Sequence, residues 1–218
     1  HSGVSVGPDG ATHQAIEDIA ITRVIPNMVV IAPCDSIEAK KATIAAAKYK
    51  GPVYIRFTRE KTPVMTTDET PFEIGKAEIF REGKPARHAS QGDAGGDVTL
   101  IGCGPLVYEA LKAAEELAKE GIEAEVINNH TIKPMDKDTI LKSVKKTGCV
   151  VTIEEHQAAG GMGSAVSEIL SQNYPAPMEI IGVQDRFGES GEPSELLEKF
   201  GLTAKNIAEA VKRVLKRK

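Results

Sequence analysis

The sequence lacks the features that mark several broad classes of protein. No apolar run approaches the roughly 18 residues that a membrane-spanning helix needs. There is no excess of positive charge, because 27 basic and 31 acidic residues give a formal net charge of −4. A charge of this sign favours neither a phosphate polymer nor an anionic membrane surface. We therefore expect no nucleic-acid partner and no membrane partner.

Cysteine is also scarce. The 218 residues include three cysteines, Cys34, Cys103 and Cys149, an odd number without a C-x-x-C pair. Each lies in or beside an apolar run, where a small apolar side chain fits. These features do not suit the disulfide framework of a small secreted domain. We interpret the three as reduced, structural thiols of a cytoplasmic protein.

The first residues carry no sign of a secretory leader. The chain begins with His1 rather than methionine, and a glycine-rich segment stands where a leader would have a basic and then an apolar stretch. A mature protein rarely begins in such a loop. We expect an upstream part that is cut off or is carried by another polypeptide.

Strands and helices alternate in the first third of the chain. Residues 15–25 have one apolar helical face, ended by Pro26, and a second helix runs from a capping Ser36 to Tyr49. The face of the first helix is formed by Ile16, Ile19, Ala20 and Val24. The apolar runs 28–32 and 53–57 are typical of buried parallel strands. This order predicts a parallel α/β sheet with right-handed crossovers.

Residues 72–97 interrupt the pattern, since the stretch KPARHASQGDAGGD is rich in glycine, alanine and polar residues. We interpret them as a linker and surface loop. Further strands are predicted at 98–103, 124–127, 150–153 and 178–183, with helices after Gly104-Pro105 and at 137–146, 163–172, 193–199 and 204–216. The predicted fold class is α/β, with two parallel-sheet domains: residues 1–71, incomplete at the N-terminus, and residues 98–218.

The opening segment HSGVSVGPDGATHQ contains two histidines, an aspartate and three glycines. We expect His13 in the first turn of the helix, where the helix dipole disfavours imidazolium and keeps the ring able to accept a proton. Asp9, an acceptor when ionised, suits a ligand rich in hydroxyls. The alternative is that Asp9 and Thr12 cap the helix, with His1 and His13 as ordinary surface residues.

Arg59, in the segment IRFTRE, follows the predicted strand 53–57. Ligands of open parallel sheets bind beyond the carboxyl ends of the strands, and the planar guanidinium matches a phosphate group. The alternative is a surface arginine paired with Glu60 or another acid.

Residues 154–164, EEHQAAGGMGS, place glycines between a predicted strand and a predicted helix. Such a turn can bind an anion at the helix N-terminus, but the P-loop lysine and the dinucleotide glycine spacing are absent. A tight turn with close packing is the favoured interpretation. We interpret His156 as structural or subunit-facing, and assign no function to His88 or His130.

The whole chain resembles the transketolases, especially split forms in which the pyrimidine-binding and C-terminal domains are a separate subunit. The resemblance rests on the opening segment, the following I-P-N-M and A-P-x-D, and the stretches VTLIGCGPLVYEALKAAEEL and EEHQAAGGMGSAVSE. It implies the end of the pyrimidine-binding domain at 1–71 and a transketolase C-terminal domain at 98–218. It also implies transfer of a two-carbon ketol unit between ketose and aldose phosphates.

The resemblance further implies roles for four residues. His1 would contact the donor sugar, Asp9 would bind the acceptor's α-hydroxyl, His13 would assist proton transfer, and Arg59 would hold the terminal phosphate. Thiamine diphosphate and Mg²⁺, or another divalent cation, would be bound mainly by residues outside this chain, because the family's G-D-G…N-N segment is not found. The chain would be inactive alone and would need an N-terminal transketolase part or subunit, in a homo-oligomer.

Related activities remain as alternatives. A deoxyxylulose-phosphate synthase would be expected to have Asp-Arg where this chain has His1-Ser2, and a 2-oxo acid dehydrogenase β-subunit would not be expected to have D-G-x-T-H or Arg59. A further alternative is an assembly module without catalytic residues. It predicts no sensitivity of activity to Asp9 or His13.

Overall fold

The computed structural model describes residues 1–84 and 95–218. The surface-loop prediction for 85–94, which include His88, lies outside the described residues. The helices are η1 Val4–Val6, α1 Asp18–Arg23, α2 Ser36–Lys48, α3 Leu106–Lys119, α4 Lys137–Thr147, α5 Met162–Asn173, α6 Pro193–Lys199 and α7 Ala204–Leu215. The strands are β1 Val29–Ile31, β2 Val53–Ile55, β3 Glu78–Arg81, β4 Val98–Gly102, β5 Ala124–Asn128, β6 Thr131–Lys133, β7 Val150–Gln157 and β8 Met178–Val183.

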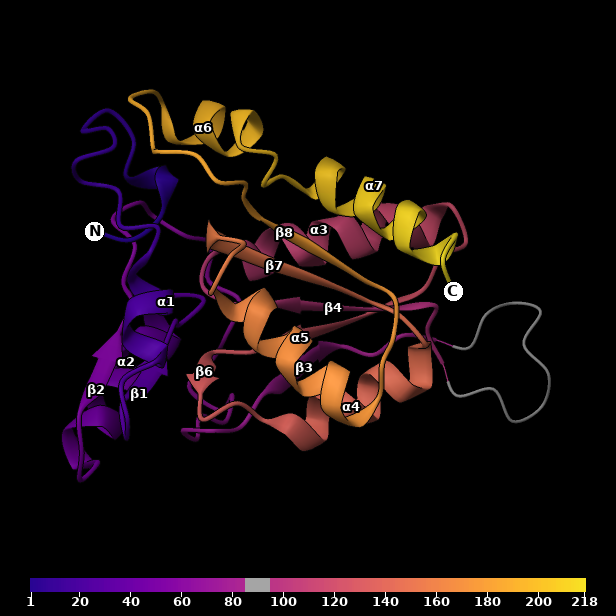
Figure 1. Ribbon diagram of the computed structural model, residues 1–218, viewed down its shortest axis with the longest axis horizontal. Coiled ribbons are helices and arrows are strands. Elements are labelled where there is room, and N and C mark those ends of the chain that lie inside the picture. The colour runs from indigo at the N-terminus through magenta and orange to yellow at the C-terminus, as the bar shows by residue number, and fades with distance from the viewer. Residues whose placement is uncertain (85–94) are drawn as a thin grey trace.

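A five-stranded sheet forms the centre of the larger unit. Its strand order is β3-β5-β4-β7-β8, and the four strands from β5 to β8 are parallel. Helices α3 and α7 cover one face of the sheet, and α4 and α5 cover the other (Figure 1). This arrangement confirms the predicted α/β class.

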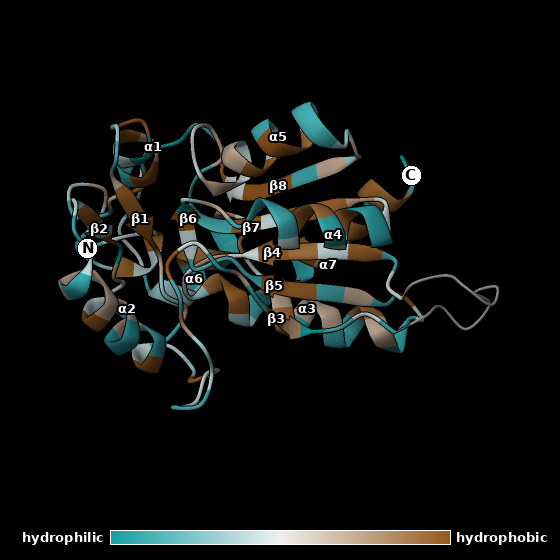
Figure 2. Ribbon diagram, turned by 90° about the horizontal axis from the view of Figure 1, so that it is seen from below, coloured by the Kyte–Doolittle hydropathy of each residue, from teal (hydrophilic) through white to brown (hydrophobic). Residues whose placement is uncertain are grey.

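The central strands are buried and mostly apolar because both faces of the sheet are covered. Successive side chains point to opposite faces, so Leu100 packs in the core beneath α3 and α7 while Ile101 packs in the core with α4 and α5. Figure 2 shows these strands as mostly hydrophobic segments between the helices. The larger unit therefore has two apolar cores, one on each side of the sheet.

A smaller sheet of three strands has the order β2-β1-β6. Strands β1 and β2 are parallel, with Val30 opposite Tyr54, and they lie in a different sheet from β4, as predicted. Strand β6, which the sequence analysis did not predict, pairs antiparallel with β1. Since β6 follows β5 directly, the chain passes from the larger sheet into the smaller one and ties the two together.

Two sequence predictions about the first helices are wrong in detail. Helix α1 begins at Asp18, so Ile16 is buried ahead of the helix and Val24 is 74% exposed after it. Asp35, rather than Ser36, is the N-cap of α2, since its carboxylate accepts a hydrogen bond of 2.8 Å from the amide of Glu38. At α2 the capping carboxylate just before the helix marks where it begins, whereas α1 has no side-chain cap from the residue before it.

The stretch predicted as linker contains a strand. Strand β3 pairs antiparallel with β5 at the edge of the larger sheet, with Glu78 opposite Asn128. Its central residue Ile79 is 42% exposed. A short edge strand with so little burial gives only a weak apolar pattern, which explains why the sequence did not reveal it.

The three cysteines are free and buried, as predicted. Burial raises the pKa of each thiol, that of Cys149 to about 11, so all three are protonated at neutral pH. Within residues 1–84 and 95–218, no helix combines the length and the apolar character needed to cross a bilayer.

Candidate functional site

The first residues are fixed beside the end of strand β2. Ser2 forms a parallel bridge with Ala15, and its amide and hydroxyl both donate to the carbonyl of Phe57, at 3.2 and 2.7 Å. The amide of Ala15 donates to the carbonyl of His1 at 2.9 Å. These bonds place exposed His1 at the carboxyl end of the smaller sheet, the side on which parallel α/β sheets bind ligands.

Asp9 and Arg59 form an ion pair between the guanidinium Nη1 and the carboxylate Oδ2. The two residues are 50 positions apart, and the fold brings together one from the opening segment and one from beyond β2. Both side chains reach solvent, with exposed fractions of 46% for Arg59 and 36% for Asp9. A pair this exposed contributes about 0.2–1 kcal/mol to stability, so an anionic ligand can compete for the arginine.

A cleft of about 420 Å³ lies beside Arg59. Its walls are formed by residues that follow the carboxyl ends of β1 and β2, and they include Pro33, Asp35, Phe57, Arg59 and Lys61. The cleft lies at the end of the sheet where parallel α/β sheets bind ligands, and the ligand site there stays a prediction. The charged groups of the cleft are two bases, Arg59 and Lys61, and two acids, Asp35 and Glu60.

His13 lies in a turn rather than in a helix. Its amide donates to the carbonyl of Gly10 at 3.0 Å, its Nδ1 is 2.9 Å from the hydroxyl of Thr12, and its side chain is exposed. Since α1 begins at Asp18, the predicted effect of the helix dipole on His13 is wrong. The alternative, in which Asp9 and Thr12 cap the helix, is wrong for the same reason.

The four predicted site residues are brought together only in part. Asp9 and Arg59 are in contact, and His1 is held at the neighbouring strand end. Among residues 1–84 and 95–218, neither the His1 nor the His13 side chain makes a hydrogen bond to Asp9 or Arg59. The geometry therefore places Asp9, Arg59 and His1 near the carboxyl end of the smaller sheet, without joining the four residues into one hydrogen-bonded catalytic unit.

The side chain of Glu154 occupies the glycine-rich turn after β7. Glu154 accepts hydrogen bonds from the first amides of α5, at 2.6 Å from Met162 and 2.8 Å from Gly163. A Cβ atom at Gly161 would lie 2.2 Å from the Glu154 carboxylate. The turn therefore serves close packing, the interpretation favoured from the sequence. Burial raises the pKa of Glu154 to about 7, against the opposing effect of the two amides.

The next two residues connect β7 to the smaller unit. Glu155 accepts a hydrogen bond of 2.5 Å from the amide of Ser5, and a Cβ at Gly3 would lie 2.3 Å from its side chain. The Nε2 atom of His156 accepts from the amides of Ile19 and Ala20, at 3.1 and 3.4 Å. Burial lowers the pKa of His156, which keeps the ring neutral for this capping role. His156 is therefore structural, one of the two roles proposed from the sequence.

Arg56 is a buried residue that the sequence analysis missed. Its guanidinium donates to the Asp18 carboxylate at 2.9 Å, to the Ala15 carbonyl at 3.1 Å and to the Glu155 carbonyl at 2.7 Å. The side chain is 2% exposed. It thereby joins β2, the opening segment, α1 and β7. The only signal in the sequence was a basic residue inside an otherwise apolar strand.

His130 is also structural. Its ring is buried and stacks on Phe72 with the centroids 4.3 Å apart. Burial lowers its pKa to about 4, so it is neutral. This agrees with the absence of any function assigned to it from the sequence.

Comparison with protein families identifies both units. The model of the transketolase pyrimidine-binding domain matches residues 1–65, and that of the transketolase C-terminal domain matches residues 88–207. The chain belongs to the transketolase family. The fold and the order of the two units agree with the resemblance noted from the opening segment and the EEHQAAGGMGS stretch.

Relatives of this transketolase chain include separate subunits. It is 44% identical over 216 residues to the 6-deoxy-6-sulfo-D-fructose transketolase subunit SqwH of Clostridium sp. (strain MSTE9), covering 99% of this chain and 63% of that protein. It is 43% identical over 220 residues to a putative transketolase C-terminal section of Methanocaldococcus jannaschii, covering 100% of this chain and 65% of that protein. The chain thus spans less than two thirds of the length of either relative.

A solved structure described as a split gene transketolase, inactive beta4 tetramer, is 41% identical and superimposes with a TM-score of 0.87. The match covers 99% of this chain and 65% of that one. It extends over both sheets, so the arrangement of the two units is shared with that protein.

Members of the transketolase family use thiamine diphosphate. In the part of this chain that the structure describes, no group of three or more His, Cys, Asp or Glu side chains could hold a metal ion. The carboxylates nearest the smaller sheet already accept hydrogen bonds within the protein. Asp18 accepts from Arg56, and Asp35 accepts from the amides of Glu38 and Met65. These residues do not fit the metal-bound diphosphate, and we assign none of them to it.

Proposed function

We propose that the chain is the substrate-binding component of a transketolase that transfers a two-carbon ketol unit between ketose and aldose phosphates. The observation that carries the proposal is the Asp9–Arg59 pair at the carboxyl end of β2, beside a cleft of about 420 Å³. The pair offers the Asp9 carboxylate to substrate hydroxyls and the Arg59 guanidinium to an anion, at the mouth of the same site. We propose residues 1–71 and 98–218 as the limits of its two domains.

Arg59 would bind the terminal phosphate of the sugar, and Asp9 would accept a hydrogen bond from the α-hydroxyl of the acceptor. The exposed pair between them contributes about 0.2–1 kcal/mol. A charged hydrogen bond to a ligand contributes about 1.5–3 kcal/mol. Exchange of the internal pair for contacts with substrate is therefore favourable, and the pair keeps both groups at the rim before substrate arrives.

The two histidines would act on the reacting end of the sugar. His1, fixed through its carbonyl to Ala15, would contact the donor, and His13, on an exposed turn, would move a proton at a substrate hydroxyl. Thiamine diphosphate would supply the carbanion chemistry, held with Mg²⁺ by a partner subunit or N-terminal part. The chain by itself would be inactive.

The phosphate-binding role is tested with Arg59→Ala and Arg59→Lys in the assembled enzyme. Loss of a charged hydrogen-bonding pair, about 2–3 kcal/mol, should raise KM for a phosphorylated sugar about 30- to 150-fold, with little effect on its unphosphorylated counterpart. Lysine should restore part of the loss, because it keeps the charge without the planar fork. Steady-state kinetics give, for each of the two sugars, the ratio of the variant's KM to the wild-type KM.

The matched control is Arg213→Ala, which removes an arginine that is 54% exposed and paired with Glu179 on the far side of the larger unit. It should change neither ratio. If Arg59→Ala gave the same KM ratio for both sugars, Arg59 would not recognise the phosphate group. A sugar sulfonate, suggested by the name of the Clostridium relative, is the third substrate in the series and distinguishes a phosphate site from a general anion site.

A further inference from the structure

Gln14 connects the opening segment to the larger unit. Its side-chain amide is buried, with 4% of the residue exposed, and Nε2 donates to the carbonyls of Val4, Gly7 and Glu189 at 3.0, 3.4 and 2.8 Å. The first carbonyl belongs to η1, the second begins the turn that carries Asp9, and the third lies 175 residues further along the chain than Gln14. All three partners are acceptors, so the site requires a donor and excludes a carboxylate of the same size.

The residues around Gln14 approach too closely for side chains. We call residues 7–13 the acceptor loop and residues 184–192 the supporting loop. A Cβ at Gly10 would lie 2.5 Å from the Ser190 hydroxyl, and a Cβ at Gly188 would lie 1.8 Å from Oε1 of Gln14. The φ angle of Gly10 is 76°, which also favours glycine. The acceptor loop therefore contacts the supporting loop at Gly10, and Gln14 contacts it at Gly188.

The supporting loop is itself held firmly by the larger unit. The side chain of Gln157 accepts from the amide of Asp185 at 3.1 Å and donates to the carbonyl of Arg186 at 2.7 Å. Glu189 pairs with both Arg186 and Lys199.

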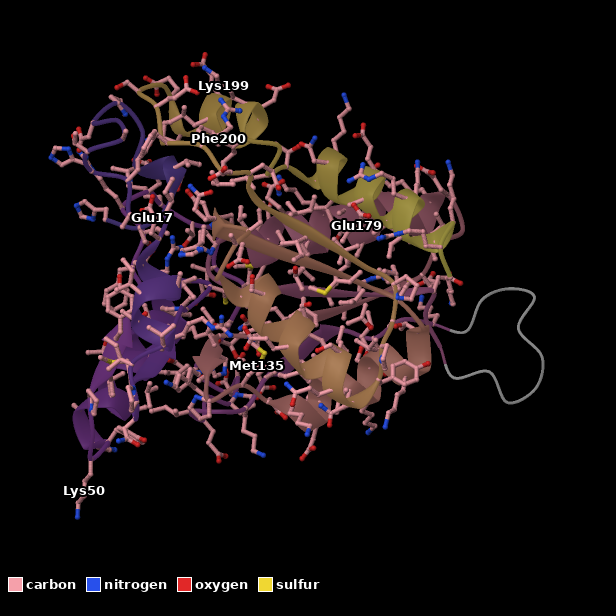
Figure 3. All side chains as sticks on the ribbon, viewed as in Figure 1. Glu17, Lys50, Met135, Glu179, Lys199 and Phe200 are labelled. Atoms are coloured by element: carbon pink, nitrogen blue, oxygen red, sulfur yellow. The ribbon has the colours of Figure 1, made fainter. Side chains whose placement is uncertain are left out.

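The guanidinium of Arg186 lies 4.6 Å from the centre of the Phe200 ring. Figure 3 shows Lys199 and Phe200 together at the end of α6, above the strands of the larger sheet. The supporting loop is thus a fixed surface against which the acceptor loop can be positioned.

We propose that Gln14 is a positioning residue through which the larger unit sets the place of Asp9, and so the choice of acceptor. The proposal rests on the proposed function of Asp9. Asp9 lies between Gly7 and Gly10, the two points at which the acceptor loop touches Gln14 and the supporting loop. His1 has separate anchors on Ala15 and Phe57, so release of the acceptor loop should affect Asp9 more than His1.

The test uses two variants that break the same contact from opposite sides, Gln14→Leu and Gly188→Ala, in the assembled enzyme. Both should speed amide hydrogen exchange in residues 5–13. Both should lower the ratio of kcat/KM for an α-hydroxylated acceptor to kcat/KM for an acceptor without that hydroxyl, by about 10-fold for one lost hydrogen bond and its positioning. Gln172→Leu, at an exposed glutamine on α5, is the matched control and should change none of these.

Unchanged exchange in residues 5–13 in either variant would overturn the proposal. Equal losses of kcat/KM on both acceptors would also overturn it, because a purely structural role lowers activity without changing selectivity. A wild-type enzyme that transfers no ketol unit would overturn the proposed function instead, and the exchange rates would still decide whether Gln14 positions the loop.

Discussion

Replacing Arg56 with methionine should destabilise the protein far more than replacing Arg59 with alanine, although the two arginines are three residues apart. Arg56 is 2% exposed and donates to Asp18, Ala15 and Glu155. Its loss leaves the Asp18 carboxylate, 10% exposed, without its cation. Breaking a buried pair from one side costs about 3–5 kcal/mol, because the remaining charge stays desolvated.

Arg59 makes an exposed pair, for which about 0.2–1 kcal/mol is expected. In a protein of this size, 1 kcal/mol changes Tm by about 2–4 °C. Arg56→Met should therefore lower Tm by about 6–20 °C, and Arg59→Ala by at most about 4 °C. Thermal unfolding followed by circular dichroism on the wild type and both variants measures the difference.

A second substitution separates the buried charge from other effects of the first. Asp18→Asn in the Arg56→Met background removes the uncompensated charge and should recover part of the lost stability, which gives a double-mutant cycle for the pair. Similar Tm values for Arg56→Met and Arg59→Ala would refute the reasoning from burial. So would a double variant less stable than Arg56→Met alone.

Three further predictions test other parts of the account. Gly3→Ala should lower the free energy of unfolding, measured by urea denaturation, by about 1–3 kcal/mol, since φ is 84° and the new Cβ would overlap Glu155; an unchanged free energy would contradict this. Glu154 has a pKa of about 7, above its ordinary 4.5, so its contribution to stability is lost as pH rises from about 4.5 to 7. Urea unfolding of Glu154→Gln should show a flatter pH dependence over that range, and matching slopes would argue against it. His13→Ala should lower kcat in the assembled enzyme roughly 100-fold, whereas a small, uniform loss would favour a surface role.

The regular elements of the larger unit were predictable because their apolar patterns are long. Strands at 98–103 and 178–183 and the helices at 137–146 and 193–199 were placed within about two residues, a consequence of a sheet covered on both faces. Strands β3 and β6 were missed. Each is short and pairs antiparallel at a sheet edge, so its existence depends on a partner distant in sequence rather than on its own composition.

The roles of the candidate site residues stay predictions, and the sequence did not reveal the geometry that brings two of them together. Asp9 and Arg59 could be singled out by residue type and position, but their ion pair joins residues 50 positions apart. Arg56 and Gln14 were missed because each acts through backbone carbonyls supplied by several elements. His13 was assigned to a helix that begins at Asp18, because the apolar pattern of 15–25 did not reveal the irregular turn before it.

The central claim is tested most directly by identifying the product made by the assembled enzyme. The chain is combined with the polypeptide that carries the rest of the enzyme, thiamine diphosphate and Mg²⁺, and is given a ketose phosphate with an aldose phosphate. In parallel it is given pyruvate with glyceraldehyde phosphate. The account predicts a new ketose phosphate two carbons longer than the acceptor in the first mixture and no product in the second. Deoxyxylulose phosphate in the second mixture, with no ketol transfer in the first, would contradict it.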